Sequence, residues 1–516
     1  MNTSETGQNS SESAPKDGDM PVNSGVLTLE QIQNFEGKYP KQLWYLFTVE
    51  MWERFCFYGM RGILAIFMVN QLQFHEKEAN LKYGAIQAFV YAFTFLGGIF
   101  ADKILGFKKS LTFGALMMIA GNSLIAIAPH DFFFLGIALS VIGTGFFKPN
   151  ISTMVGQLYK DGDTRKEAGF GWFYSGINIG ALLGGVICVW LGKNHSWSLA
   201  FWAAALVMLL GLITFLLTKK YLGPIGDSPL KEALPKVRLK KEILVYVIAF
   251  VTIPFIFLMI QNTDYTDYFM YMVGPLALIY FFYQFRKITS SSERKKLIAA
   301  LILILLSIIF FALFEQAGGS LALFANKNLH HKLLFFHIDP NIVNNAANSF
   351  FVIVFAPLLG ILWIWLDKKR LEPNTVVKFG ISFVLLALAY YVFFSMRLFA
   401  DDNGIASLNV FAGAYFVMTI SELCLSPVGL SMITSLSPKH LSGMMMGLWF
   451  LASAYGQYVA GLIGAGISNP NENASLLEKL DSYTSGYGQL AFYAIIVAVI
   501  VLVFSPIVRK LMQDVK

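Results

Sequence analysis

The chain consists of long apolar runs separated by short polar segments. Apolar runs of roughly 18 residues or more, enough for an α-helix to cross a bilayer, recur along most of the sequence. They predict about fourteen membrane-spanning helices, near residues 43–71, 82–101, 109–128, 132–158, 167–192, 197–218, 243–262, 267–286, 297–325, 342–366, 374–396, 406–436, 441–467 and 484–512. We therefore expect an all-α polytopic membrane protein.

Composition supports this fold class. Hydrophobic residues make up 56% of the 516 positions and charged residues only 14%, which excludes an ordinary soluble domain. Lysine and arginine concentrate in the loops on one side of the spans, above all in residues 219–241, 286–296 and 367–370. By the positive-inside rule this side is cytoplasmic, so both termini are expected there and the protein in the cytoplasmic (inner) membrane.

The net charge of +7 arises in these loops and does not indicate nucleic-acid binding. The three cysteines, Cys56, Cys188 and Cys424, lie in separate apolar spans. This spacing argues against disulfides and against a zinc or other metal site.

The chain divides into four regions. The first 30 residues contain no aromatic residue and are rich in serine and asparagine, so residues 1–40 are expected to form a disordered cytoplasmic tail. Residues 41–220 and 291–516 each supply six spans, and residues 221–290 form a basic linker followed by an inserted two-helix hairpin. Two such bundles with a site between them near the midplane are typical of secondary transporters.

The first span carries four charged residues: Glu50, Glu53, Arg54 and Arg61. Helical geometry places all four within about 60° of Glu50, on one face. Charges at mid-bilayer cost several kcal/mol unless they face protein or water, so this face is expected to line a polar cavity. A purely structural ion pair is the alternative.

Other spans also contain polar residues. Lys148 precedes Pro149 in GTGFFKPNIS, and Glu315 lies in FEQAGGSL. An intramembrane lysine is expected to pair or to bind an anion, with snorkelling as the alternative, and Glu315 is expected to pair with Arg61 or Lys148.

The remaining candidates are uncharged or acidic. Tyr174 and Asn178 share a helix face, where substrate binding and interhelical bonding are equally compatible with the pattern. Trp449 is expected to pack as readily as to touch a ligand. Further polar candidates in the C-terminal half are Asn348, Glu422, Ser426 and Gln457.

Five motifs, in order, resemble the signatures of the proton-coupled oligopeptide transporter family (POT or PTR2) of the major facilitator superfamily. They are EMWERFCFYGMR, GTGFFKPNIS, WFYSGINIGALLGG, FEQAGGSL and ELCLSPVGL, and the resemblance extends from about residue 43 to about residue 467. It implies a major facilitator fold of two six-helix bundles, with two extra helices between them in bacterial members.

The resemblance also implies roles for individual residues. Proton coupling would involve Glu50, Glu53, Arg54, Lys148 and Glu315, and the ion pair of Arg61 with Glu315 would close one mouth of the site. Arg54 and Lys148 would meet the peptide carboxylate, and Glu422, Asn178 and Asn348 its ammonium. The full expected substrate site is Arg54, Tyr58, Tyr91, Lys148, Tyr174, Asn178, Asn348, Glu422, Ser426, Trp449 and Gln457.

Three positions depart from the family pattern: Gly84 replaces a histidine of several relatives, Ser349 a proline and Gln457 an asparagine. We expect a monomeric symporter that imports dipeptides and tripeptides with protons, in contact with membrane lipid and without a cofactor. Another cargo (a peptidomimetic drug, nitrate or an amino-acid conjugate) is the alternative. A membrane enzyme or a channel is disfavoured, because no HExxH, GxSxG or Walker sequence and no repeated pore segment occurs.

Overall fold

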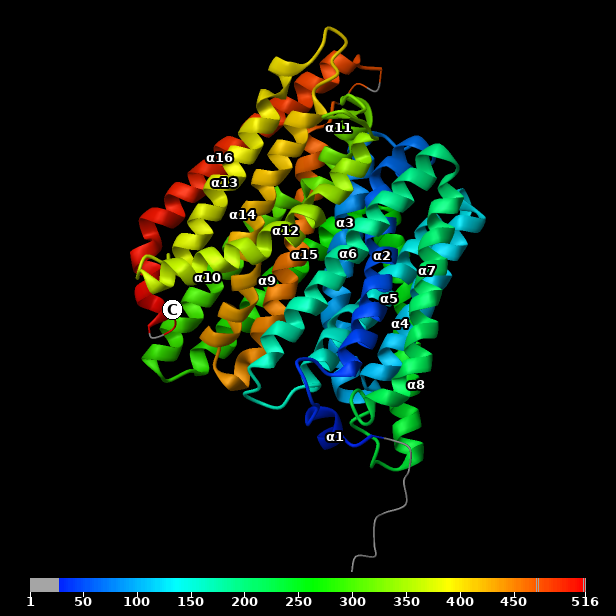
Figure 1. Cartoon of the computed structure of the whole chain (residues 1–516), viewed down its shortest axis with the longest axis vertical. Helices are drawn as coiled ribbons and strands as arrows, with labels where there is room; N and C mark the ends of the chain where they lie inside the picture. The colour runs from blue at the N-terminus through cyan, green and yellow to red at the C-terminus, as the bar shows by residue number, and fades with distance from the viewer. Residues whose placement is uncertain (1–26, 470, 472, 514, 516) are drawn as a thin grey trace, which may run out of the picture.

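A computed structural model describes residues 27–469, 471, 473–513 and 515. Within these residues the chain forms two helical bundles, which lie together at one end and diverge toward the end that carries α1 and the C-terminus (Figure 1). The N-terminal bundle comprises α2 (Lys41–Asn70), α3 (Glu76–Phe100) with the π-helical turn η1 (Ala101–Leu105), α4 (Phe107–Ile127), α5 (Pro129–Gln157), α6 (Arg165–Asn194) and α7 (Trp197–Thr218) with the 3-10 turn η2 (Lys219–Leu222).

The hairpin consists of α8 (Pro235–Gln261) and α9 (Thr263–Lys287). The C-terminal bundle begins with α10 (Ser291–Phe314), which the 3-10 turn η3 (Glu315–Gly318) separates from α11 (Ser320–Lys327). A two-stranded antiparallel hairpin, β1 (Lys332–Leu333) and β2 (Phe336–His337), follows. The bundle continues with α12 (Pro340–Lys368), α13 (Thr375–Ser395), η4 (Met396–Phe399), α14 (Leu408–Leu436), η5 (Lys439–Leu441), α15 (Ser442–Ile467) and α16 (Leu476–Met512).

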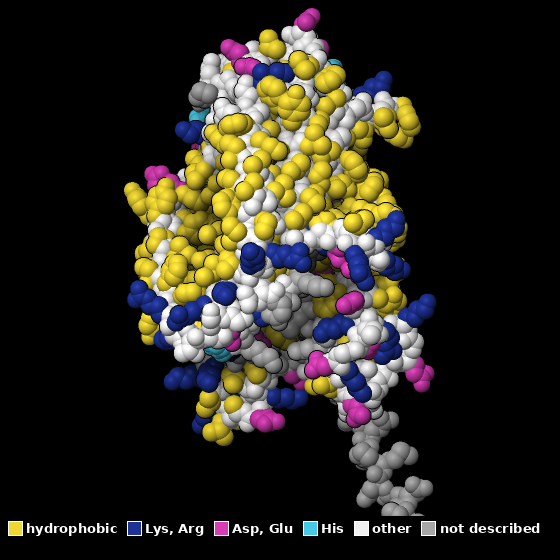
Figure 2. Space-filling model, turned by 90° about the vertical axis from the view of Figure 1, so that its left-hand side faces the viewer, with side chains coloured by type: hydrophobic (Ala, Val, Ile, Leu, Met, Phe, Trp, Pro, Cys, Tyr) yellow, Lys and Arg dark blue, Asp and Glu magenta, His cyan; other side chains and the backbone are white. Residues whose placement is uncertain are grey.

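The predicted membrane fold is confirmed. Thirteen helical segments of the described chain are long and apolar enough to cross a membrane. The fourteenth is α2, which is 30 residues long but is made more polar by its five charged residues, Lys41 and the four named above. Figure 2 shows the lipid-facing character of one face, where a broad band of hydrophobic side chains lies above gathered Lys and Arg side chains.

Four spans begin six or more residues before their predicted starts, among them α8 at Pro235 instead of 243 and α10 at Ser291 instead of 297. The sequence predicts starts near residues 82 and 484, whereas α3 begins at Glu76 and α16 at Leu476. In α16 a capping box between Ser475 and Glu478 satisfies the first backbone N–H groups. Hydropathy reports only the part of a helix inside the bilayer, so these polar first turns were not predicted.

Part of the expected disordered tail is folded. Residues 1–26 lie outside the described residues, but Leu29–Gln33 forms the short helix α1, capped by Thr28 and Gln31. Gln33 donates a hydrogen bond to the carbonyl of Gln157 at 3.0 Å, which ties α1 to the end of α5. Disorder over the whole of 1–40 is therefore wrong.

Helix α2 is held against α6 by small residues. A Cβ at Gly180 or Gly184 would collide with the backbone carbonyl oxygens of Met51 or Phe55. The spacing of four residues between these glycines keeps them on one face, so the two backbones approach closely. This packing fixes the rotation of α2 and thereby the direction of its charged face.

The hairpin is joined to the N-terminal bundle by a buried lysine of α3. Lys82 Nζ donates to the carbonyl of Gln261, the last residue of α8, at 2.6 Å. It also lies 3.3 Å from Glu78 and over the ring of Phe134 at 5.1 Å. The ammonium thus satisfies carbonyl groups at the negative end of the α8 dipole.

Replacing this lysine should loosen the hairpin. Lys82→Met retains the length of the side chain but removes the donor, so we expect a loss of about 1–2 kcal/mol of stability. Thermal unfolding of the purified protein in detergent measures the loss. Glu78→Gln is the matched control, because it removes only the half-exposed partner of Lys82, and an equal loss in both variants would contradict the role assigned to the carbonyl contact.

Candidate functional site

The charged face of α2 forms a buried cluster. Glu50, Glu53 and Arg54 are each at most 2% exposed. Arg54 Nε lies 3.2 Å from a Glu50 carboxylate oxygen and donates a hydrogen bond to Glu53. Within the described residues, one oxygen of each carboxylate and one guanidinium nitrogen have no hydrogen-bond partner. Two carboxylates share one base, so this cluster can accept a proton without losing its ion pair.

Lys148 of α5 contacts an aromatic ring. Its Nζ lies 4.4 Å from the ring centroid of Tyr91 on α3. Within the described residues it forms no ion pair, whereas the buried lysines Lys82 and Lys479 are neutralised, Lys82 by Glu78 and carbonyl groups and Lys479 by Glu76. Lys148 is therefore a cation inside the bundle that is available to an anionic group.

An ion pair connects the two bundles. Arg61 of α2 pairs with Glu315 of η3, and Arg61 Nε also donates to the hydroxyl of Tyr83 at 2.7 Å. Because η3 interrupts the helix between α10 and α11, Glu315 is placed at a break in the span, close to the opposite bundle. The pair bridges the bundles beside the space between them.

In the C-terminal bundle, α12 and α14 bring amide and acidic groups together. Asn348 Nδ2 donates to a Glu422 carboxylate oxygen at 2.8 Å. The hydroxyl of Tyr415 donates to Asn344 Oδ1 at 2.6 Å. Among the residues described, no lysine or arginine pairs with Glu422, so its carboxylate can accept a cationic group.

A cavity of about 260 Å³ lies between the bundles. Both bundles contribute to its lining, which includes aromatic, amide and charged side chains. The candidate residues on its wall are Tyr58, Arg61, Tyr91, Glu315, Asn348, Glu422 and Ser426, together with Asn344, Asn345, Ser349 and Tyr415. Lys148 is adjacent to this wall through its contact with Tyr91.

The other expected residues are not on the cavity wall. Asn178 is buried and donates within its own helix to the Tyr174 carbonyl at 3.0 Å, whereas the Tyr174 side chain is 43% exposed. Trp449 packs against Gly429. Gln457 is buried, with its Oε1 unpartnered, and lies where α15 meets α3.

Position 84 has a packing role. A Cβ at Gly84 would lie 2.7 Å from the Cα atom of Gly461 in α15, closer than real side chains approach. The two backbones touch at this point, so a histidine at residue 84 does not fit this arrangement. The departure from the family pattern is therefore accompanied by a close contact between the bundles.

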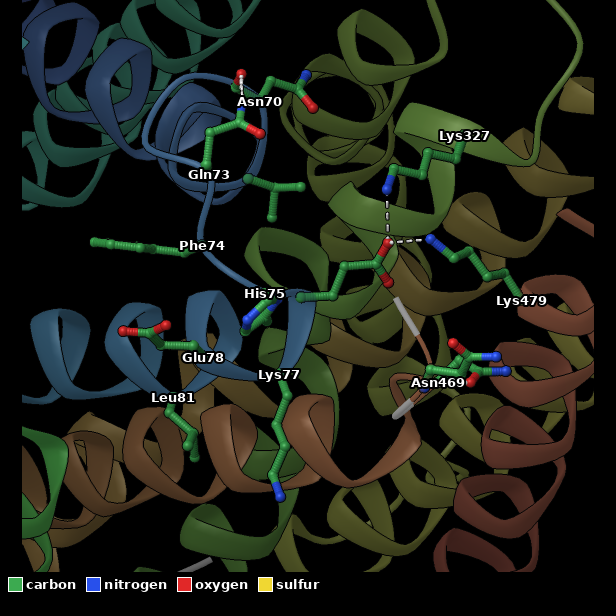
Figure 3. Close-up of a pocket in the computed structure, with 13 residues that line it drawn as sticks. Asn70, Gln73, Phe74, His75, Lys77, Glu78, Leu81, Lys327, Asn469 and Lys479 are labelled. Carbon is green, nitrogen blue, oxygen red and sulfur yellow. Dashed lines mark hydrogen bonds and ion pairs between the residues drawn. The ribbon is translucent and has the colours of Figure 1, made fainter. Parts of the chain in front are cut away.

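A polar network that was not predicted joins the two bundles at the end opposite the termini, which we call the outer end. Glu76 lies 2.9 Å from Lys327 Nζ and 3.4 Å from Lys479 Nζ, and Figure 3 shows these two lysines converging on one carboxylate. Glu76 also accepts a hydrogen bond from Tyr483 at 2.5 Å. Lys327 and Lys479 belong to the C-terminal bundle and Glu76 to the N-terminal one. Asn80, one turn further, donates to Ser468 at 3.1 Å.

A pattern in the sequence points to this network. Glu76, Asn80, Tyr83 and Gln87 recur at intervals of four, three and four residues and therefore share one face of α3. These polar residues lie just before or within an apolar run. They therefore indicate that this face of α3 packs against protein and not against lipid. A second bridge at the same end joins Lys193 to Asp339 at 3.0 Å.

Over the described chain, no group of three or more His, Cys, Asp or Glu side chains is arranged to hold a metal ion. Cys56, Cys188 and Cys424 are unpaired and buried.

Comparisons with known proteins agree with this architecture. A model of the POT family matches residues 108–480. The chain is 30% identical to dipeptide and tripeptide permease A of Pectobacterium carotovorum over 496 residues. This alignment covers 96% of each protein. It is 29% identical to the permease A of Escherichia coli K12, covering 92% of this chain and 94% of the permease. A crystal structure of a peptide transporter POT in complex with sulfate is 31% identical, with a TM-score of 0.82 over 95% of this chain and all of that one.

Proposed function

The chain belongs to the POT family, and we propose that it imports dipeptides and tripeptides together with protons by alternating access. Membership of a family of permeases also means that the protein is a transporter and not an enzyme. We further propose that it works as a monomer in the cytoplasmic membrane, with both termini in the cytoplasm.

One observation carries the substrate assignment. Glu422 of the C-terminal bundle lines the cavity, and Lys148 of the N-terminal bundle lies against the ring of Tyr91, which lines the same cavity. Neither Lys148 nor Glu422 forms an ion pair within the described residues. A short peptide in solution carries a carboxylate and an ammonium at its two ends. Fixed charges of opposite sign on the two bundles suit such a zwitterion, and recognition of the termini leaves the side chains free to vary.

Nitrate fits this arrangement less well, because a single anion has no use for Glu422 and Asn348. A peptidomimetic drug with both terminal charges fits as well as a peptide. An uptake competition between dialanine and such a compound distinguishes a peptide carrier with broad tolerance from a dedicated drug carrier.

Proton coupling follows from the excess of carboxylates near Arg54. Protonation of Glu53 or Glu50 leaves Arg54 with fewer acidic partners, so the guanidinium can turn toward the peptide carboxylate. Protonation of Glu315 releases Arg61 and weakens the bridge between the bundles. An entering proton contributes about 2.3 kcal/mol per 100 mV and about 1.4 kcal/mol per pH unit, enough to concentrate peptide many-fold.

Uptake of labelled dialanine into proteoliposomes tests the function. We expect accumulation under an imposed inward proton gradient and none after addition of a proton ionophore. Absence of dialanine uptake by folded protein would exclude this substrate class, and uptake that ignores the ionophore would exclude symport.

The network around Glu76 should hold the outer end closed. Glu76→Gln removes the charge that two lysines share, so we expect the outer ends of the bundles to separate in a larger fraction of molecules. Spin labels at Lys77 and Asp481, in a background without the native cysteines, measure this fraction as longer label-to-label distances.

Glu78→Gln is the matched control for this experiment, because Glu78 pairs with Lys82 inside the same helix. Its distance distribution should equal that of the wild type. Identical distributions for Glu76→Gln and the wild type would show that the network does not hold the bundles together.

A further inference from the structure

A second cavity lies on the outer wall of the N-terminal bundle, away from the space between the bundles. It has a volume of about 900 Å³ and opens where α4, the end of α7 and α8 lie together at one edge of the molecule (Figure 1). Its lining shares no residue with the cavity between the bundles and consists of Lys108, Lys109, Thr112, Phe113, Leu116, Met117, Lys219, Lys220, Gly223, Asp227, Tyr246 and Phe250. We call it the α4–α8 groove.

The wall of the α4–α8 groove is apolar along the spans. Leu116 is 48% exposed and Phe250 51% exposed. The ring of Phe113 lies 5.0 Å from that of Tyr246 and 6.1 Å from that of Phe250, which joins α4 to α8 across the groove. Because these helices cross the membrane, exposed apolar side chains here face lipid acyl chains.

The end of the groove nearest the termini is basic. Lys108 contacts Asp227 at 2.7 Å, and Lys109 contacts Glu242 at 2.6 Å. Lys219 and Lys220 are exposed, and neither forms an ion pair within the described part of the chain. Two lysine charges at the rim therefore remain unneutralised.

Asp227, the acidic residue in the lining of the groove, does not neutralise Lys219 and Lys220. Asp227 is shared, because Lys231 also lies 3.0 Å from it. Burial raises the pKa of Asp227, but hydrogen bonds from Lys108 and Lys231 outweigh this effect, and the net result is a lowered pKa. Asp227 thus stays ionised and paired with Lys108. Lys219 and Lys220 are therefore available to bind another anion.

We propose that the α4–α8 groove binds an anionic phospholipid of the leaflet on the side of the termini. The phosphate would lie near Lys219 and Lys220, and an acyl chain would follow Phe113, Leu116 and Phe250. A soluble anion uses only the basic rim, and a zwitterionic lipid brings a cation of its own to the lysines. Basic groups at headgroup depth above an apolar wall match a lipid that is anionic overall.

Lipid titration of the purified full-length protein, followed by native mass spectrometry, tests this site. We expect dioleoylphosphatidylglycerol to bind at least about tenfold more tightly than dioleoylphosphatidylcholine. The double variant Lys219→Gln/Lys220→Gln should lose most of this preference. The matched control is Lys368→Gln/Lys369→Gln, which removes two exposed lysines at the same end of the other bundle and should keep the preference.

Two further arms separate the lipid from other anions. Leu116→Trp fills the apolar wall without changing charge, so it should weaken phosphatidylglycerol binding while the lysines remain. Inorganic phosphate at millimolar concentration should not displace the lipid. An equal loss in the two lysine double variants, no loss in Leu116→Trp, or displacement by inorganic phosphate would each overturn the proposal.

Discussion

Glu53→Gln should abolish proton-driven accumulation of dialanine in proteoliposomes, by about 100-fold, while counterflow exchange stays within about threefold of the wild type. A factor of 100 corresponds to about 2.7 kcal/mol, less than the driving force of a typical proton gradient. Glutamine has the size of glutamate and can still accept a hydrogen bond from Arg54, but it cannot bind and release a proton. The variant therefore separates coupling from binding.

Two controls accompany this experiment. Glu78→Gln also removes a glutamate, from a half-exposed position on α3, and it should transport normally. The same assays on Glu50→Gln show how much each of the two carboxylates, Glu50 and Glu53, contributes to proton coupling. Wild-type accumulation by Glu53→Gln would place proton coupling outside this residue.

Lys148→Ala should lose both uptake and counterflow, again by about 100-fold or more. The substitution removes the cation that we assign to the peptide carboxylate, and nearby Arg54 is already occupied by Glu50 and Glu53. A lost charge contact inside a bundle typically costs several kcal/mol of binding. Counterflow of labelled dialanine at increasing peptide concentration measures the loss without any gradient.

The control for this variant is Lys103→Ala, which removes an exposed lysine of η1 and should leave counterflow unchanged. Lys148→Arg retains the charge and should recover part of the exchange activity. If Lys148→Ala exchanged dialanine like the wild type, the carboxylate of the peptide would have to bind elsewhere.

Together the two variants test the division of labour inside the N-terminal bundle. Loss of accumulation alone in Glu53→Gln and loss of exchange in Lys148→Ala fit a proton site beside a separate substrate site. Loss of exchange in both variants would instead indicate that Glu53 is itself needed for peptide binding.

The sequence was sufficient for the fold because a bilayer leaves few alternatives. Every backbone polar group inside the membrane must be satisfied within a helix, so each long apolar run reports one span. The spans, the two six-helix bundles and the inserted hairpin were all predicted in this way. Ends such as those of α3 and α16 were not, because the turns that project beyond the bilayer are polar.

Within the site, the sequence was informative wherever the spacing along one helix decides the geometry. Glu50, Glu53 and Arg54 are one to four residues apart, so helical periodicity alone places them together. The partner of Glu315 could not be chosen in this way, since Arg61 and Lys148 were both available. The break at η3 and the rotation of α2 against α6 decide in favour of Arg61.

By itself, then, the sequence determined the number of spans, the regions of the chain, the charged face of α2 and the resemblance to one transporter family. Only the tertiary structure decided which groups meet across helices: Asn348 with Glu422, Glu76 with Lys327 and Lys479, and Gly84 with Gly461. The physical reason is the distance along the chain over which each signal acts. Helical periodicity and hydropathy act over a few residues, whereas contacts between helices depend on the rotation and depth of each helix, which packing of the whole bundle sets.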